Sequence, residues 1–226
     1  MSDLNAKQVN LSIKIALALL LVFTALIITR YYYGAKVLKD EAAYLESLNK
    51  VTDQVSEPIL TAPVIRPTDP MLGQPAAKNQ LVIYSDFQCP HCADAVQVLG
   101  QLLQNHPTDV LLIWKDFPNP DYPQSQRAAL AARCAAVQNK FWEFHDYLYA
   151  NQDQLGTNLY NEVATALKLD LAKFNQCYDN QEATTLIAED FQEGLSLRLN
   201  GTPYLFINNQ RFDDQITLEA LEKALK

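Results

Sequence analysis

The chain has 226 residues, of which 49% are hydrophobic and 19% charged, and its formal net charge is −8 at pH 7. This composition is sufficient for a packed core, and the length suits one domain with appendages. The acidic balance excludes nucleic acid as a partner, because a protein that binds phosphates needs a basic surface.

The first predicted element is an uncharged apolar run at residues 15–29, which is bracketed by Lys14 and Arg30 and followed by three tyrosines at residues 31–33. A helix needs about 20 apolar residues to cross a bilayer, and tyrosines favour the membrane interface. We therefore predict a single transmembrane anchor at residues 13–33, preceded by a short tail at residues 1–12.

A cleaved signal peptide is the alternative for this segment. The best cleavage position follows Ala35, but Tyr33 occupies a position where a small residue is preferred. The uncleaved anchor is the favoured interpretation. Lysines and arginines flank the run on both sides, so charge does not orient it.

Residues 34–61 predict an amphipathic helix and a linker. Within residues 36–56 an apolar stripe repeats at spacings of four, three and four, as in a coiled-coil seam, and consists of Tyr44, Leu48, Val51 and Val55. This pattern predicts self-association as a homodimer; docking on the chain's own domain or on the membrane surface are the alternatives. Prolines recur through residues 57–79, which indicates an extended linker or a wrapping arm.

Residues 62–226 predict one α/β domain. Short apolar runs at residues 81–84, 109–114 and 204–207 are typical of buried strands, and a helix is expected after the first run and another at residues 218–225. Asn208-Asn209 predicts a hairpin turn into a strand beginning at Arg211-Phe212. The residues from about 120 to 198 predict a helical insertion punctuated by four turn or cap residues: Asn151, Gly156, Asp170 and Asn180. A β-α-β unit followed by a hairpin and a helix is a thioredoxin-like layout.

The motif Cys89-Pro90-His91-Cys92 lies between the first predicted strand and the following helix. Unpaired N–H groups and the positive end of the helix dipole favour a thiolate there, so the pKa of Cys89 should be depressed. Pro90 suits the first helical turn, His91 adds a polar or cationic group, and Cys92 lies one turn away, within disulfide reach of Cys89.

A zinc site is the structural alternative for these two cysteines. A structural zinc ion needs four ligands, and no second C-x-x-C motif exists in the chain. We therefore expect no metal and no organic cofactor. The remaining cysteines, Cys134 and Cys177, lie in two predicted helices of the insertion, where buried free thiols are one interpretation.

The second functional element is Gly201-Thr202-Pro203-Tyr204. A proline at the start of a strand costs no central ladder bond. An X-Pro bond fixed in the cis form often marks a functional turn, whereas an ordinary trans turn is the alternative.

Three segments, SDFQCPHC, GTPYLFINN and AARCAAVQNKFWEFHDYL, together resemble the DsbA-like family of the thioredoxin superfamily. The resemblance covers about residues 65–226. It implies an exposed nucleophile at Cys89, a buried resolving thiol at Cys92, a cis Pro203 packed against this pair, and a Thr202 backbone that pairs with a substrate peptide. It also implies a helical cap over the site and a structural disulfide between Cys134 and Cys177.

The resemblance further implies the reaction and its partners. The expected function is oxidation of cysteine pairs in exported proteins, with reoxidation by a quinone-linked membrane protein and a domain on the periplasmic or extracytoplasmic side of the inner membrane. Because threonine before the proline also occurs in disulfide isomerases, isomerase or reductase activity is the first alternative. A non-catalytic, chaperone-like surface module is the second.

The sequence departs from related enzymes in one respect. Many of them carry a buried carboxylate six residues before the first cysteine, where this chain has Ile83. The nearest acids are Asp86 and Asp116, with Lys115 adjacent. Asp86 is our candidate proton acceptor for Cys92, and a turn or cap residue is its alternative interpretation.

Overall fold

The computed structural model describes residues 24, 29–30 and 60–225. Residues 24 and 29–30 are helical, whereas the rest of the predicted anchor at 13–33 and the predicted self-associating helix at 36–56 lie outside the described residues. Within the described part of the chain, no helix combines the length and apolarity needed to cross a membrane.

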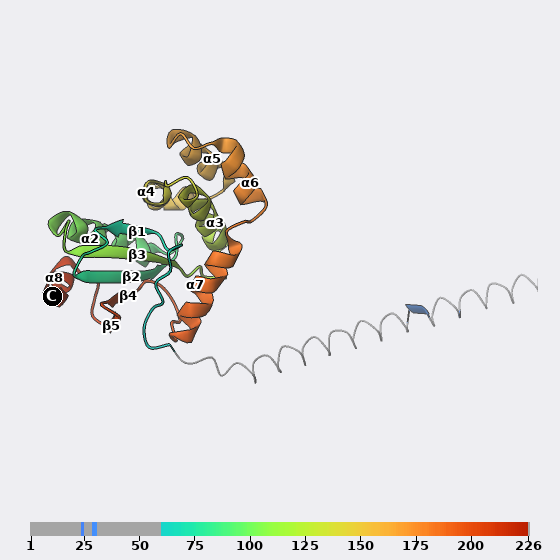
Figure 1. Ribbon diagram of the computed structural model, residues 1–226. Coiled ribbons are helices and arrows are strands. Elements are labelled where there is room, and N and C mark those ends of the chain that lie inside the picture. The colour runs from blue at the N-terminus through green and yellow to red at the C-terminus, as the bar shows by residue number, and fades with distance from the viewer. Residues whose placement is uncertain (1–23, 25–28, 31–59, 226) are drawn as a thin grey trace, which may run out of the picture. The chain divides into compact units, whose positions relative to one another are not determined.

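Five strands form one mixed sheet in the order β1-β3-β2-β4-β5 (Figure 1). The parallel pair β2 (Asn79–Ser85) and β3 (Val110–Asp116) forms its buried centre, as the continuous apolar runs predict. Strand β4 (Tyr204–Ile207) is antiparallel to β2, and β5 (Gln210–Phe212) returns along β4. This arrangement confirms the predicted thioredoxin-like α/β layout.

The turn between β4 and β5 is the predicted Asn-Asn hairpin. Asn208 and Asn209 have φ angles of +51° and +66°. Two consecutive positive φ values match the twist of a two-residue hairpin, and asparagine tolerates this region better than most residues.

Strand β1 (Met71–Gly73) was not predicted. It pairs antiparallel with β3 inside the segment that the sequence indicates to be a linker. The strand has only three residues, all exposed, and prolines lie on both sides, so no local pattern reveals it. Gly73 has φ +112°, and a Cβ there would lie 2.3 Å from the carbonyl oxygen of Val110, so only glycine allows this close pairing.

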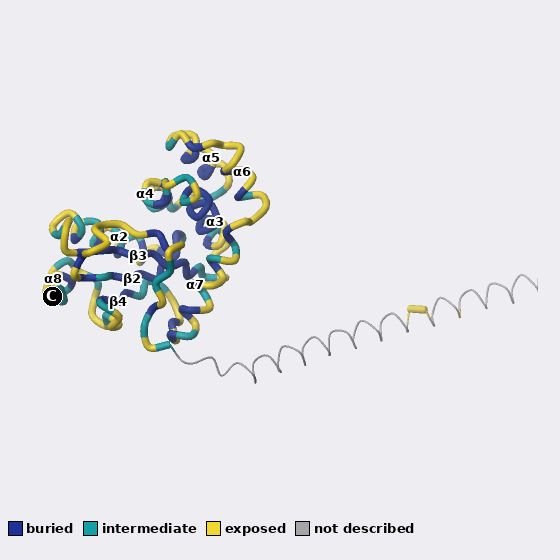
Figure 2. Tube along the Cα trace, in the orientation of Figure 1, coloured by how far each residue is buried: buried dark blue, intermediate teal, exposed yellow. Residues whose placement is uncertain are grey.

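Helices cover both faces of the sheet. Helices α2 (Pro90–Asn105) and α8 (Leu218–Ala224) pack on the face that carries Ile83 and Trp114. The opposite face carries Tyr84, which packs with residues 60–65 and with Phe191 of the insertion. Figure 2 shows the central strands buried and the outer loops exposed.

The insertion between β3 and β4 is helical, as predicted. Its helices are α3 (Ser125–Ala136), α4 (Phe141–Ala150), α5 (Thr157–Ala166), α6 (Leu171–Asp179) and α7 (Thr184–Ser196), with a 3-10 turn at Gln152–Gln154. Figure 1 shows α3 to α6 as a lobe beyond one end of the sheet, with α7 returning to it.

The four predicted punctuation residues all stand at helix ends. Asn151 ends α4, Gly156 precedes α5, and Asp170 and Asn180 bound α6. The Asp170 side chain accepts hydrogen bonds from two N–H groups of the first turn, which explains why the helix begins there.

A buried ionic cluster joins Asp69, in the segment before β1, to residues of β3, α3 and α7. Lys115 is fully buried, and its Nζ lies 2.8 Å from Asp69 and 3.1 Å from Asp190. Arg133 contacts both Asp116 and Asp190 at 2.5 Å. Each of these charges is paired, as burial requires, so the Asp116 carboxylate has a structural partner.

Candidate active site

The Cys89 motif lies where β2 leads into α2. Cys89 is the N-cap residue of α2, and Pro90 occupies its first position, where a missing N–H costs nothing. The helix therefore begins at the residue that the motif predicts. His91 is exposed on the first turn.

The expected exposure of Cys89 is not found. Its side chain is only 5% exposed, and its Sγ lies 3.6 Å from the carbonyl oxygen of Thr202. The turn before β4 therefore covers the sulfur. Cys92 is fully buried, as implied for a resolving thiol.

The two thiols have opposite acidities. A hydrogen bond from Cys92 is the largest cause that lowers the pKa of Cys89, to about 5. A hydrogen bond with Thr202 and the backbone N–H groups of Cys92 and His91 lower the pKa further, against the effect of burial. Burial raises the pKa of Cys92 far above its ordinary value. The pair can thus hold one thiolate, and it resides on Cys89.

The Thr202–Pro203 peptide bond is cis. The Thr202 carbonyl oxygen lies 3.6 Å from Cys89 Sγ, immediately before β4 begins at Tyr204. A cavity of about 540 Å³ opens beside this turn, lined by His91, Pro203, Tyr204 and residues 211–217. The motif and the proline are therefore brought together from chain positions more than a hundred residues apart.

The helical lobe contacts the motif directly. The Nε2 atom of Gln152 donates hydrogen bonds to the carbonyl oxygens of Phe87 and Cys89, at 2.8 and 2.9 Å. The Tyr149 hydroxyl donates to the carbonyl oxygen of Asp86 at 3.1 Å and lies 2.9 Å from Ser85 Oγ. The turn before α2 is thus held by α4 and the 3-10 turn after it.

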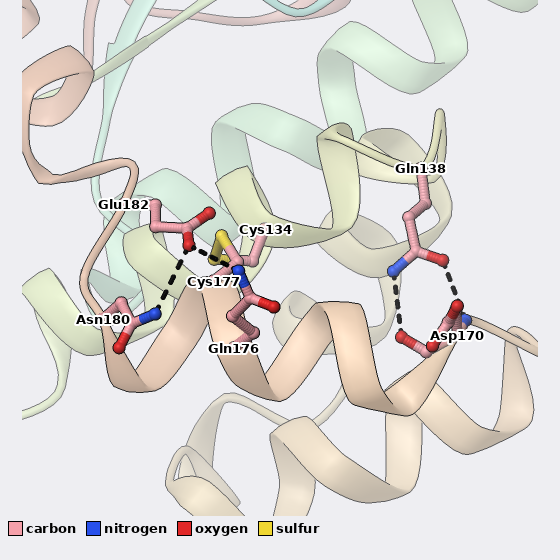
Figure 3. Close-up of a disulfide and its surroundings, with 7 residues drawn as sticks. All are labelled: Cys134, Gln138, Asp170, Gln176, Cys177, Asn180 and Glu182. Carbon is pink, nitrogen blue, oxygen red and sulfur yellow. Dashed lines mark hydrogen bonds between the residues drawn. A yellow bond between two sulfur atoms is a disulfide. The ribbon is translucent and has the colours of Figure 1, made fainter.

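A disulfide lies inside the helical lobe. Cys134 of α3 and Cys177 of α6 are bonded, with their Cα atoms 5.7 Å apart (Figure 3). Beside it, Gln138 donates to the carbonyl oxygen of Asp170 at 3.2 Å and accepts from its N–H at 2.8 Å. The disulfide joins α3 to the body of α6, and the bonds of Gln138 join the turn after α3 to the beginning of α6.

Comparison with known proteins gives the family. A family model described as Thioredoxin matches residues 66–226. A thioredoxin-like oxidoreductase from Silicibacter pomeroyi DSS-3 superposes with a TM-score of 0.64 at 26% identity, covering 70% of this chain and 91% of that one. The chain belongs to the thioredoxin family, whose model spans most of its length.

Two further similar proteins support different conclusions about this member of the thioredoxin family. The thiol-disulfide exchange protein α-DsbA2 from Wolbachia pipientis superposes with a TM-score of 0.62 at 20% identity, covering 79% of this chain and 92% of that one, and shows the fold alone. The Na(+)/H(+) antiporter NhaA 3 of Salinispora tropica is 35% identical over 167 residues, 74% of this chain. That match spans only 26% of the antiporter, about a quarter of its length.

The position of Asp86 in this thioredoxin-family site favours its interpretation as a turn residue. Its carboxylate accepts hydrogen bonds from the N–H groups of Gln88 and Asn119, at 2.7 and 2.8 Å, and from Ser125 Oγ at 2.7 Å. These bonds fix the turn that leads to Cys89. The carboxylate is therefore engaged in holding the turn rather than free to accept a proton from Cys92.

Sequence reasoning missed three residues that lie at this site: Ser85, Tyr149 and Gln152. Ser85 is the residue before Asp86, so its place at the end of a strand was a detectable signal. Tyr149 and Gln152 lie some sixty residues beyond the motif in the helical lobe, and only tertiary packing brings them to it. Among residues 60–225 no group of three or more histidine, cysteine or acidic side chains is arranged to hold a metal ion.

Proposed function

We propose that this protein introduces disulfide bonds into exported proteins through Cys89 and Cys92. The observation that carries the proposal is the opposite displacement of the two pKa values, down to about 5 for Cys89 and upward for Cys92. A stable thiolate favours the reduced enzyme, and a stable reduced form makes the corresponding disulfide a strong oxidant.

The reaction consists of two thiol–disulfide exchanges. A substrate thiolate attacks Cys89 in the oxidised enzyme, the Cys89–Cys92 bond breaks, and its electron pair leaves on Cys92. The second substrate thiolate then attacks the substrate sulfur of the mixed disulfide, and Cys89 leaves as a thiolate. The substrate acquires the disulfide and the enzyme keeps two thiols.

Several residues of the motif and of the proline turn have proposed roles in this reaction. Pro90 and His91 shape and polarise the helix start, and Pro203 packs against the cysteine pair. The Thr202 backbone pairs with an extended substrate segment, and the cavity beside Pro203 offers room for its side chains. A quinone-linked membrane protein reoxidises the pair, so neither a metal nor an organic cofactor takes part.

The proposed location is the outer side of the cytoplasmic membrane, with residues 13–33 as the anchor. The Cys134–Cys177 disulfide supports this location, because such bonds persist in oxidising compartments. Reporters fused after residue 80 test it: activity only from a reporter that works outside the cytoplasm is expected. Residues 36–56 are proposed to pair two copies, which sedimentation of residues 36–226 beside residues 62–226 tests.

The decisive experiment is the redox state of the Cys89–Cys92 pair in growing cells, trapped with acid and an alkylating reagent. An oxidase rests with the pair oxidised. A reduced resting state would favour the second candidate, an isomerase or reductase, which the threonine at position 202 motivates. Absence of any exchange, measured as insulin reduction, would leave a non-catalytic, chaperone-like module.

A further inference from the structure

The site lacks the buried carboxylate of many related enzymes, and the buried sulfur of Cys92 needs another polar partner. Position 83 is isoleucine and fully buried, and the Asp86 carboxylate is occupied by the turn that it holds. Cys92 itself is completely inaccessible to solvent. In the proposed reaction this sulfur leaves as a thiolate, and a buried anion without a hydrogen-bond donor is strongly disfavoured.

Two hydroxyl groups, those of Ser85 and Tyr149, lie at the end of β2 that leads to the cysteine motif. Ser85 is 1% exposed at the end of β2, and a hydrogen bond from its side chain acts on Cys92 in the direction that lowers the pKa of that thiol. Its Oγ lies 2.9 Å from the hydroxyl oxygen of Tyr149, and either oxygen can be the donor. Tyr149 in turn lies 3.1 Å from the carbonyl oxygen of Asp86, which can only accept.

We propose that Ser85 is a catalytic residue that stabilises the Cys92 thiolate, and that Tyr149 positions and polarises the Ser85 hydroxyl. This inference rests on the proposed exchange reaction. Substrate sulfur bonds to Cys89, the Cys89–Cys92 bond breaks, and the electron pair of that bond stays on Cys92. Ser85 donates its proton in a hydrogen bond to this new anion, and Tyr149 donates to Ser85.

The same hydroxyl groups accommodate the protonated thiol by reversing their direction. Cys92 takes up one of the two protons that the substrate thiols release. The thiol then donates to Ser85, Ser85 donates to Tyr149, and Tyr149 donates to the carbonyl oxygen of Asp86. Because a hydroxyl both donates and accepts, the chain is satisfied in either state. A carboxylate would instead place a second negative charge beside the leaving thiolate.

The other charged and titratable groups near the Ser85 and Tyr149 hydroxyls do not take over their role. Burial is the main cause that raises the pKa of the Tyr149 phenol; the charges of Cys92, Asp86 and Cys89 raise it further, and the hydrogen bond with Ser85 acts in the opposite direction. Neutral Tyr149 is therefore the form present at ordinary pH. The pathway from Cys92 to the Asp86 carbonyl consists of two neutral hydroxyls from β2 and α4.

The test is single-turnover reduction of the oxidised full-length protein by dithiothreitol, followed by acid quenching and mass analysis. This reagent breaks the Cys89–Cys92 bond whatever the natural substrate. Ser85→Ala should slow the step by about 10- to 100-fold, as expected on losing a hydrogen bond to a charged atom. Ser85→Thr, which keeps the hydroxyl, should restore much of the rate, and Tyr149→Phe should slow it by about 3- to 10-fold.

Two further measurements separate this role from a structural one. Tyr147→Phe, an exposed tyrosine on the same helix, should react like the wild type. The pKa of Cys89 should remain near 5 in Ser85→Ala, whereas a disturbed motif would raise it. A Ser85→Ala protein that keeps this pKa and is reduced at the wild-type rate would overturn the inference. A reduced resting state in cells would overturn the proposed oxidase function without affecting this result.

Discussion

Gln152 Nε2 lies 2.9 Å from the carbonyl oxygen of Cys89 and donates a hydrogen bond to it. The same nitrogen donates to the carbonyl oxygen of Phe87 at 2.8 Å. One amide from the helical lobe thus fixes the backbone on both sides of residue 88, immediately before α2. The lobe is therefore part of the site's framework as well as a cover.

Replacing Gln152 should loosen this framework. We expect Gln152→Ala to lower the free energy of unfolding by about 1–3 kcal/mol, because the carbonyl groups of Phe87 and Cys89 each lose a hydrogen-bond donor. Gln152→Glu should also raise the pKa of Cys89, since a carboxylate would face the thiolate. Urea unfolding and thiolate absorbance measure the two effects. Gln154→Ala in the same turn is the control, and equal losses in both variants would refute a specific role for Gln152.

The acidity of Cys89 depends first on its partner cysteine. The reduced wild-type protein should titrate with a pKa of about 5, measured by thiolate absorbance. Cys92→Ala should raise this pKa, because the hydrogen bond from Cys92 is the largest lowering cause. The value should still stay below the ordinary cysteine pKa of about 8.5, since the backbone donors of the helix start remain. An unchanged pKa in Cys92→Ala would contradict this order of causes.

The lowered pKa of Cys89 also predicts how pH affects stability. In the reduced protein the folded state holds the thiolate where the unfolded chain still binds a proton, so stability rises with pH between about 5 and about 8.5. The gain is present above this window and is lost as pH falls through about 5. The oxidised protein has no such thiol. The unfolding free energy of the reduced protein should therefore rise relative to that of the oxidised protein as the pH increases. The same pH dependence in both forms would contradict the lowered pKa of Cys89.

The Cys134–Cys177 disulfide should be structural. It closes a sequence separation of 43 residues between α3 and α6. Replacing both cysteines by alanine should lower stability by about 3–4 kcal/mol in the chain-entropy model, because the unfolded chain gains freedom. Reduction of the Cys89–Cys92 pair should keep its wild-type rate. A variant that folds but reacts slowly would instead indicate a redox role for the second pair.

Alanine substitutions at two helical glycines should change the stability of the protein in opposite directions. A Cβ at Gly194 in α7 would lie 2.5 Å from the Phe117 ring, whereas a Cβ at Gly100 in α2 would meet nothing within 4 Å. Gly194→Ala should destabilise by about 1–3 kcal/mol through overpacking. Gly100→Ala should stabilise by up to about 1 kcal/mol through helix propensity. Thermal unfolding of both variants checks the contrast, which would be absent if the two shifts had the same sign.

Local patterns in the sequence determined much of this protein. The apolar runs of β2 and β3, the Asn208-Asn209 turn and the caps at Asp170 and Gly156 all depend on interactions within a few residues. The placement of Cys89 at a helix N-terminus follows from the same local chemistry, with Pro90 marking the first turn. The helical insertion was also detectable, because its punctuation residues stand at the ends of α4, α5 and α6.

The tertiary structure decided what depends on distant contacts. Strand β1 exists because Gly73 approaches Val110 of β3, and nothing within residues 71–73 requires a strand. The burial of Cys89 comes from Thr202, more than a hundred residues away. The contact between Ser85 and Tyr149 could not be predicted for the same reason, because Tyr149 comes from the helical lobe. Hydrogen-bond geometry depends on distances of a few tenths of an ångström between separate elements, and that information resides in the packing of the whole domain.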